Sequence, residues 1–206
     1  MAQALLVGLG NPGQPFEQSR HNVGFMALDA IIGHYGCSSL CLKKRFHSLW
    51  SEGVLDGVSC VLMKPQTYMN RSGMAVLSVM KYFSFSMDNV FVFHDDMDLG
   101  FLRVKVKRGG SDGGHRGIRS IDTHSHGLSK EGELGGRGRV GGAYWRVRIG
   151  VGRPVADARH HVLGSFSGEE RARLYALLAL MAEHCPLMLR GDTSHFMEHM
   201  REGAET

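Results

Sequence analysis

The sequence predicts a single-domain α/β fold, with three layers in α/β/α order and a mixed, mostly parallel twisted sheet in the middle. The 206 residues are the length of one domain with a substantial core. Apolar runs typical of strands alternate with segments of helical periodicity, as in sheets covered by helices on both faces. Asp56-Gly57, a hairpin turn signal, joins two expected strands at residues 46–55 and 58–63. Part of the sheet should therefore be antiparallel.

The composition is that of a soluble globular protein, with 43% apolar and 21% charged residues. No apolar run approaches the roughly 18 residues of a membrane span, and no secretory signal is recognisable. The four cysteines have neither C-x-x-C spacing nor the density of a disulfide framework. These features predict a cytoplasmic protein that does not bind membranes. The formal charge of +4 and the pI of about 9.0 favour anionic partners.

Strands and helices alternate along the first half of the chain. An apolar run at residues 3–9 predicts the first strand, and residues 23–35 predict a helix that ends near Gly36. The hairpin follows, and a loop at 64–71 leads to a second helix. Apolar side chains recur on that helix at helical spacing: Val76, Val79, Met80 and Phe83.

The second half continues this alternation. Short strands are expected at 90–94, 101–107 and 144–150, and a Gly-rich turn at 109–114 precedes a helix from about Arg116. A capping box then begins a long helix with an apolar face. Its markers are Ser167, Glu170, Leu174, Leu177, Leu178 and Met181, and Pro186 should end it.

Three short motifs match known sites, but their surroundings argue against each. Gly8-x-Gly10-x-x-Gly13 resembles a dinucleotide fingerprint, yet Gln14-Pro15-Phe16 follows where a helix should begin. Gly109-x-Ser111-x-Gly113 resembles the nucleophile elbow of serine esterases, although extra glycines make it a generic turn. His195-x-x-Glu198-His199 has metal-ligand spacing, but a solvated tail helix explains it better. A serine esterase using Ser111 stays an alternative.

Polar side chains gather where strands end or helices begin. Asn11 and His21 follow the first strand, Asp95 follows a central one, and Asn70 precedes the second helix. In open α/β sheets, loops at the carboxyl ends of strands hold reactive groups on a rigid frame. Together these residues supply an imidazole, a carboxylate to orient it, and amide donors, with no accompanying cysteine or metal-ligand cluster. We therefore predict a reaction site that needs neither a metal nor a cofactor.

Several spaced motifs across about residues 3–166 closely resemble those of bacterial-type peptidyl-tRNA hydrolases. They are Gly8-Leu9-Gly10-Asn11-Pro12-Gly13, Arg20-His21-Asn22-Val23-Gly24, Lys64-Pro65-Gln66-Thr67-Tyr68-Met69-Asn70, His94-Asp95-Asp96-Met97-Asp98-Leu99 and Gly113-Gly114-His115, supported by 146–154 and 162–164. The resemblance implies a monomeric, metal-independent enzyme that hydrolyses the ester between a peptide and the 3′ end of tRNA. It would thereby recycle peptidyl-tRNA released from ribosomes.

The resemblance also implies roles for individual residues. His21 would be the general base that activates water, Asp95 would orient it, and Asn11 would recognise the peptide side of the substrate. Asn70 would position the scissile carbonyl. Three residues would line the site around the terminal nucleotide and the peptide: Phe16, Tyr68 and Met69. Because an ester has a good leaving group, water activated by a base can suffice without a covalent nucleophile.

Basic residues alternate with apolar ones on two expected strands. At 101–107 the period of two places Arg103, Lys105 and Lys107 on one face, and Arg146 and Arg148 alternate in the same way further along. Such a face suits an RNA partner, although a solvated face explains the spacing as well. The resemblance implies that Lys107 and Arg148 clamp the 5′-phosphate at the tRNA acceptor stem, and we add Lys105 to this clamp.

The chain departs from the family pattern at three places. Arg116 stands where the family usually has an asparagine that contacts substrate, and it would instead bind a phosphate. Phe16 replaces a common tyrosine. The Gly-rich stretch at 123–143 is longer than expected and predicts a flexible insertion. The Arg116 departure leaves a second alternative, a non-catalytic RNA-binding protein on the same fold.

Overall fold

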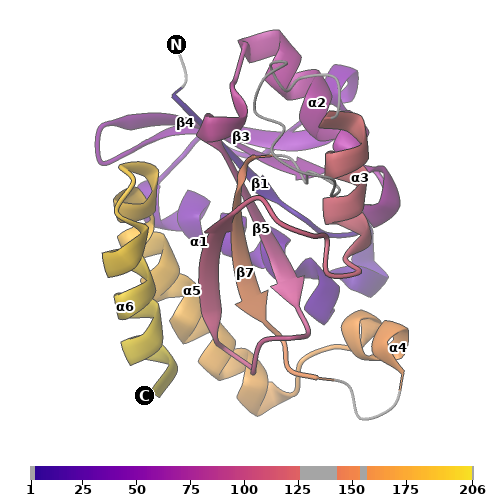
Figure 1. Ribbon diagram of the computed structural model, residues 1–206, viewed down its shortest axis with the longest axis vertical. Helices are drawn as coiled ribbons and strands as arrows, with labels where there is room; N and C mark the ends of the chain where they lie inside the picture. The colour runs from indigo at the N-terminus through magenta and orange to yellow at the C-terminus, as the bar shows by residue number, and fades with distance from the viewer. Residues whose placement is uncertain (1–2, 126–142, 154–156, 206) are drawn as a thin grey trace.

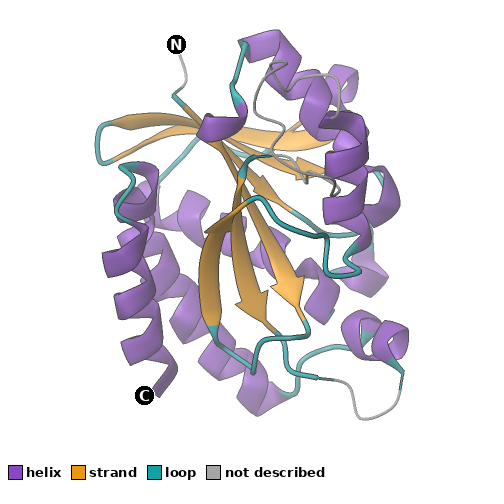
Figure 2. Cartoon of the chain, viewed as in Figure 1, coloured by secondary structure: helices purple, strands orange, loops and turns teal. Residues whose placement is uncertain are grey.

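The protein is described from a computed structural model over residues 3–125, 143–153 and 157–205. Helices cover both faces of a single seven-stranded sheet (Figures 1 and 2). The strand order is β2-β3-β4-β1-β5-β7-β6. The strands are β1 (Ala4–Gly8), β2 (Cys41–Lys43), β3 (Ser48–Leu55), β4 (Val58–Pro65), β5 (Val90–Asp96), β6 (Val104–Arg108) and β7 (Trp145–Gly150).

The four central strands, β4, β1, β5 and β7, run parallel. The outer pairings, β2 with β3, β3 with β4 and β6 with β7, are antiparallel. The mixed sheet is therefore the predicted one. Asp56 and Gly57 both adopt positive φ, the conformation that a tight hairpin turn between β3 and β4 requires.

Side chains alternate between two cores, one on each face of the sheet. Ala4 and Leu6 of β1 pack with α1 and α5, whereas Leu5 and Val7 pack with α2 and α3. Figure 1 shows α5 and α6 on the side of the sheet opposite α2 and α3. The helices are α1 (Val23–Tyr35), α2 (Ser72–Phe83), α3 (Arg116–Ser125), α4 (Ala158–Leu163), α5 (Gly168–Leu189) and α6 (Thr193–Glu205).

Several local predictions are confirmed. Gly36 ends α1 in the left-handed conformation, and Ser167 and Glu170 form the capping box of α5. By length and apolar composition α5 could cross a membrane. Its apolar face, however, lies in the core with α1, as the longest helix of a globular domain often does.

Three expectations were wrong in detail, and two elements were missed. The strand expected from 101 begins at Val104, because Leu102 turns the chain with a φ of 67°. Pro186 does not end α5: it removes one helical hydrogen bond, but buried Cys185 and Met188 hold the last turn in the core. The tail helix α6 is not merely solvated, since Phe196 and Met200 are buried. The strand β2 and the helix α4 were not foreseen.

The flexible insertion expected at 123–143 starts too early, because residues 123–125 belong to α3. At its other end, Ala143 is described and precedes the buried Tyr144. The remainder, 126–142, lies outside the described residues.

Two glycines set the distance between β1 and α1. A Cβ atom on Gly24 would lie 2.3 Å from the carbonyl oxygen of Phe93 and 2.6 Å from the backbone of Leu9. A Cβ atom on Gly8 would lie 2.4 Å from the carbonyl oxygen of Gly24. Only glycine permits this approach, which brings the start of α1, and His21 just before it, to the ends of β1 and β5.

Candidate active site

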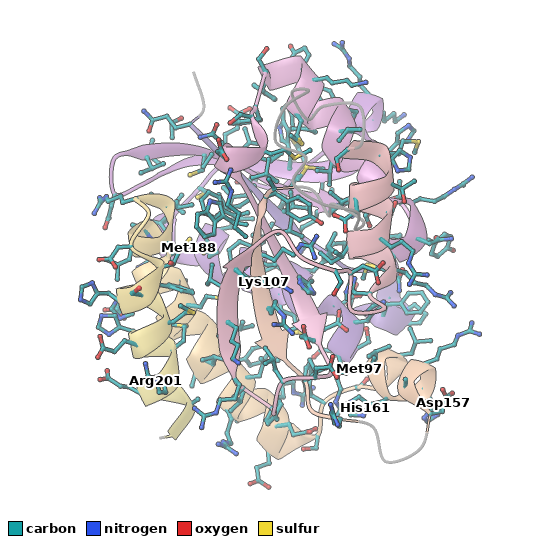
Figure 3. The ribbon with its side chains drawn as sticks, viewed as in Figure 1. Met97, Lys107, Asp157, His161, Met188 and Arg201 are labelled. Atoms are coloured by element: carbon teal, nitrogen blue, oxygen red, sulfur yellow. The ribbon has the colours of Figure 1, made fainter. Side chains whose placement is uncertain are left out.

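A cavity of about 510 Å³ opens at the carboxyl ends of β1 and β5. This is the end at which ligand sites of open α/β sheets form. Met97 lies at this end, after β5, and Asp157 lies beside α4, which covers one side of the cavity (Figure 3). The lining residues with polar or ionisable side chains include Asn11, His21, Asp95, Asp96, His115 and Arg116, together with Tyr68, Asp98, Asp112 and Arg159.

His21 and Asp95 form the predicted pair. The Nδ1 atom of His21 lies 2.8 Å from Oδ1 of Asp95, a hydrogen bond between two elements 74 residues apart. Asp95 lies next to the last residue of β5 with 3% of its side chain exposed, and His21 keeps 13% exposed at the cavity. An ionised carboxylate can only accept hydrogen bonds, so Nδ1 of His21 is the donor. In the neutral imidazole, Nε2 then carries the lone pair.

His115 is a second partner of Asp95 to which the sequence analysis gave no role. Its Nε2 lies 2.9 Å from the same Oδ1 atom. Its Nδ1 accepts from the backbone N–H groups of Gly117 and Ile118, and so caps α3. These contacts fix the tautomer of His115, with the proton on Nε2. Its position between a Gly-rich turn and a helix was the signal available in the sequence.

The charges in this group depend on one another. Burial lowers the pKa of His21, but the carboxylate of Asp95 outweighs burial, and the net pKa is raised above 6.5. The charge of Arg116 opposes this rise. Burial would raise the pKa of Asp95, but His21 and His115 hold it well below its usual range. Burial and the neighbouring His115 lower the pKa of His94 to about 3, so His94 is neutral.

Asn11 is held rigidly at the edge of the cavity. Its Oδ1 accepts from the backbone N–H of Met69 at 2.9 Å, which leaves the Nδ2 donors for a ligand. The side chain of Asn22 brackets the backbone of Asn11, accepting from its N–H at 2.8 Å and donating to its carbonyl at 3.0 Å. Asn22 is therefore a supporting residue of the site.

Arg20 anchors the segment that carries His21. Its Nη2 donates to both carboxylate oxygens of Glu170 on α5, at 2.9 and 2.8 Å, and its Nη1 donates to the carbonyl of Ser165. The guanidinium also lies over the ring of Phe166. His21 is thus tied to the helix layer through the residue before it.

The predicted lining residues are divided among three places. Phe16 and Tyr68 line the cavity, and 62% of Tyr68 is exposed. Met69 is buried beneath the cavity instead, and contributes its backbone N–H to Asn11. Asn70 lies in a neighbouring hollow of about 430 Å³, and Arg116 lines both spaces. The role of Asn70 at the scissile carbonyl stays a prediction.

The basic residues of β6 and β7 differ in depth. Lys105 pairs in register with Arg148, and Lys107 with Arg146. Lys105 is exposed, while Lys107 on β6 (Figure 3) and Arg148 are half-buried. The pKa of Lys107 is lowered by burial and by the charges of Arg148 and Arg146. These cations therefore lie close to one another.

Arg146 was wrongly expected on the basic face. Only 1% of its side chain is exposed, because α3 covers it. Its Nη2 donates to both carboxylate oxygens of Asp122 on α3, and its Nη1 donates to the carbonyl of Ser111 at 2.8 Å. Arg146 is therefore a buried strut between β7, α3 and the Gly-rich turn.

The whole chain can be compared with known proteins. Residues 5–206 match the family model described as peptidyl-tRNA hydrolase. The chain belongs to the peptidyl-tRNA hydrolase family. It is 40% identical over 204 residues to the peptidyl-tRNA hydrolase of Beijerinckia indica subsp. indica, covering 98% of this chain and 94% of the relative. It is 44% identical over 195 residues to that of Chelativorans sp., covering 94% and 74%.

The fold agrees with this membership. The crystal structure of peptidyl-tRNA hydrolase from Acinetobacter baumannii superposes with a TM-score of 0.83 at 30% identity, covering 97% of this chain and 96% of that one. The resemblance and the α/β fold class inferred from the sequence are both confirmed.

Ser111, the nucleophile of the esterase alternative, does not line the cavity of this peptidyl-tRNA hydrolase family member. Within the described part of the chain, no hydrogen bond joins its hydroxyl to a histidine. Its carbonyl instead accepts from the strut Arg146. In the metal-like motif of α6, His195 is exposed and pairs with Asp192, and His199 lies 3.9 Å from Glu202.

Only one group of potential metal ligands emerges from the described residues, namely His21, Asp95 and His115, with their ligand atoms within 4.8 Å of one another. The hydrogen bonds in this group use the imidazole protons: His115 donates from Nε2 because its Nδ1 already accepts. A cation there would have to displace both donors. The arrangement suits a pair of imidazoles that share a carboxylate, and metal independence stays a prediction.

Proposed function

We propose that His21 activates the water molecule with which this peptidyl-tRNA hydrolase cleaves the ester between peptide and tRNA. One observation carries the proposal: at the edge of the cavity, Asp95 accepts a hydrogen bond from Nδ1 of His21, which leaves Nε2 as the basic nitrogen. Asp95 is in turn held by His115.

The chemistry follows from this arrangement. Nε2 of His21 takes a proton as water attacks the ester carbonyl, and Asp95 stabilises the imidazolium. The tetrahedral intermediate then collapses, and the proton passes to the departing ribose oxygen. A positioned general base contributes about 10²- to 10⁴-fold to such a step.

Amide and aromatic groups would select the substrate. The oxygen of Asn11 is engaged by Met69, so its Nδ2 group would be the one that donates to a peptide carbonyl. This would favour blocked over free aminoacyl-tRNA. Phe16 and Tyr68 offer rings for the terminal base, in keeping with the way single-stranded RNA is bound by stacking.

The face formed by Lys105, Lys107 and Arg148 would bind the 5′-phosphate of the acceptor stem. It lies on β7, which neighbours β5 beside the cavity, and on β6 beyond it. Burial and the nearby arginines together lower the pKa of Lys107. The proposal extends to a monomeric protein acting in the cytoplasm on peptidyl-tRNA released from ribosomes.

The test is release of peptide from N-acetyl-aminoacyl-tRNA, with EDTA present and free aminoacyl-tRNA as the control substrate. The wild type should cleave the blocked substrate only, and His21→Ala should lose turnover while binding tRNA normally. Ser111→Ala should be silent. Binding of tRNA without turnover by the wild type would contradict the proposal and support the non-catalytic RNA-binding alternative, with Arg116 the first residue to examine.

A further inference from the structure

Two successive carboxylates at the end of β5 have different partners. Asp95 binds His21 and His115, as described above. Asp96 accepts from Nε of Arg148 through Oδ2 at 2.6 Å. Both carboxylates line the same cavity. One peptide unit therefore connects the group that orients the base to the group that holds a cation of the basic face.

The contact with Asp96 uses only one edge of the Arg148 guanidinium. Nε is engaged, and no hydrogen bond to the described residues engages the two terminal nitrogens. Those nitrogens form the fork that binds a phosphate through two hydrogen bonds. Lys105 is opposite Arg148 in register, and Lys107 is near enough for their charges to interact. Asp96 thus leaves the phosphate-binding edge available.

Asp96 itself is firmly held. Its Oδ1 accepts from the backbone N–H of Asp98 at 2.9 Å, and its carbonyl accepts from the N–H of Val151 at 3.1 Å. Only 13% of its side chain is exposed. A carboxylate fixed on both sides fixes the arginine bound to it.

We propose that Asp96 is a positioning residue for the tRNA phosphate. By holding the Nε edge of Arg148, it aims the terminal nitrogens at the phosphate. Because Asp96 directly follows Asp95, the β5 backbone also fixes the distance from the phosphate to the pair that cleaves the ester. Pre-orientation of this kind strengthens binding because less side-chain freedom is lost when the ligand arrives. The inference rests on the proposed function, since it takes the phosphate to be that of tRNA.

Simple electrostatics predicts the opposite effect. A carboxylate beside an anion-binding arginine repels phosphate, so its removal should strengthen binding of RNA. Positioning predicts that the same removal weakens recognition of the phosphate. The sign of the change separates the two accounts.

The experiment compares two acceptor-stem RNA hairpins with a single-stranded 3′ end, one with a 5′-phosphate and one with a 5′-hydroxyl. The measured quantity is the phosphate preference, the Kd of the hydroxyl RNA divided by that of the phosphate RNA. Asp96→Ala should lower the preference about three- to tenfold, toward the value of Arg148→Gln. Asp96→Asn offers one oxygen for two donors and should lower it less.

Asp98→Ala is the matched control. It removes the same charge from the same turn, but the side chain of Asp98 is 64% exposed and its partner is Arg153, at 3.3 Å. It should change the affinity for both RNAs equally and leave the phosphate preference unaltered. Thermal unfolding of each variant checks that the fold is intact, and Asp96→Asn alone decides the question if Asp96→Ala does not fold.

An unchanged or increased phosphate preference in the Asp96 variants would overturn the inference, as would a wild type with no preference. The proposed function is judged separately, because it fails only if the wild type does not release peptide from the blocked tRNA. A wild type that cleaves this substrate, with Asp96 variants of normal preference, would refute the positioning role alone.

Discussion

The cavity and the basic face lie side by side but are built differently. In the cavity, His21, Asp95 and His115 are buried or nearly so, and one carboxylate oxygen serves two imidazoles. On the basic face, Lys105 is exposed, Lys107 is half-buried, and the side chain of Arg148 donates to Asp96. The first region holds its protons in buried hydrogen bonds, whereas the second presents partly solvated cations on the surface.

The two regions should therefore contribute to different steps, one to transition-state stabilisation and the other to substrate binding. A rigid, desolvated group of residues can stabilise charge that develops only in the transition state, so its loss should reduce kcat. A face of partly solvated cations interacts with substrate and transition state alike, so its loss should raise KM. Substitutions in the two regions should separate these parameters.

The largest effect is expected from Asp95→Asn. The amide cannot stabilise the imidazolium, and it no longer fixes the tautomer of His21. We expect kcat for N-acetyl-aminoacyl-tRNA to fall by about 10²- to 10³-fold, with the Kd for tRNA changed less than about twofold. A loss of tRNA binding equal to the loss of turnover would erase the distinction between the regions.

Arg146→Met tests the strut beneath the basic face. Removing one partner of a buried ion pair costs about 3–5 kcal/mol, because the other charge loses its counterion in a desolvated place. Asp122 would lose its arginine and keep the hydrogen bond from the Tyr144 hydroxyl. We expect a clear fall in the free energy of unfolding, measured by denaturant titration, and none of this size for Arg148→Met. Equal destabilisation by both substitutions would show that the two arginines do not differ as described.

The double variant Lys107→Gln/Arg148→Gln tests the binding face. Loss of the phosphate contact should raise KM about tenfold and lower the slope of log KM against log salt concentration by about 1. Steady-state kinetics at several salt concentrations measure both, and kcat should change little. An unchanged slope would count against the clamp.

The smallest effect is expected from Arg116→Asn, which borders the cavity and the neighbouring hollow. Its charge lowers the pKa of His21, so the variant should move the acid limb of the pH–rate profile upward by less than about one unit. A downward shift would contradict the assigned electrostatics. Arg116→Lys keeps the charge and is the control.

The fold was predictable because most of its signals are local. Alternating apolar segments gave the sheet and its two helix layers, and Asp56-Gly57 gave the hairpin. The errors arose where packing overrides a local signal. Pro186 is tolerated within α5 because the residues around it are buried, and Leu102 turns the chain just before a strand.

The sequence predicted which residues form the site, but not how deeply each of them is buried. His21, Asp95 and Asn11 lie together as expected from strand ends. Alternation on β7 placed Arg146 and Arg148 on one face, but only the tertiary structure shows that α3 covers the first and not the second. Burial of this kind depends on contacts between distant elements, such as Asp122 with Arg146, which no spacing in the sequence reveals.

The most direct test of the account is the pH dependence of kcat/KM for N-acetyl-aminoacyl-tRNA, from about pH 5 to pH 9, in the wild type and in Asp95→Asn. His21 acts as a base only when neutral, so the rate should rise with pH through a midpoint above 6.5, since Asp95 raises the pKa of His21. Burial and Arg116 both lower the pKa of His21, and in Asp95→Asn no carboxylate offsets them. The midpoint should therefore fall below 6.5. A rate independent of pH, or a midpoint unmoved by the substitution, would contradict the assignment of His21 as the general base.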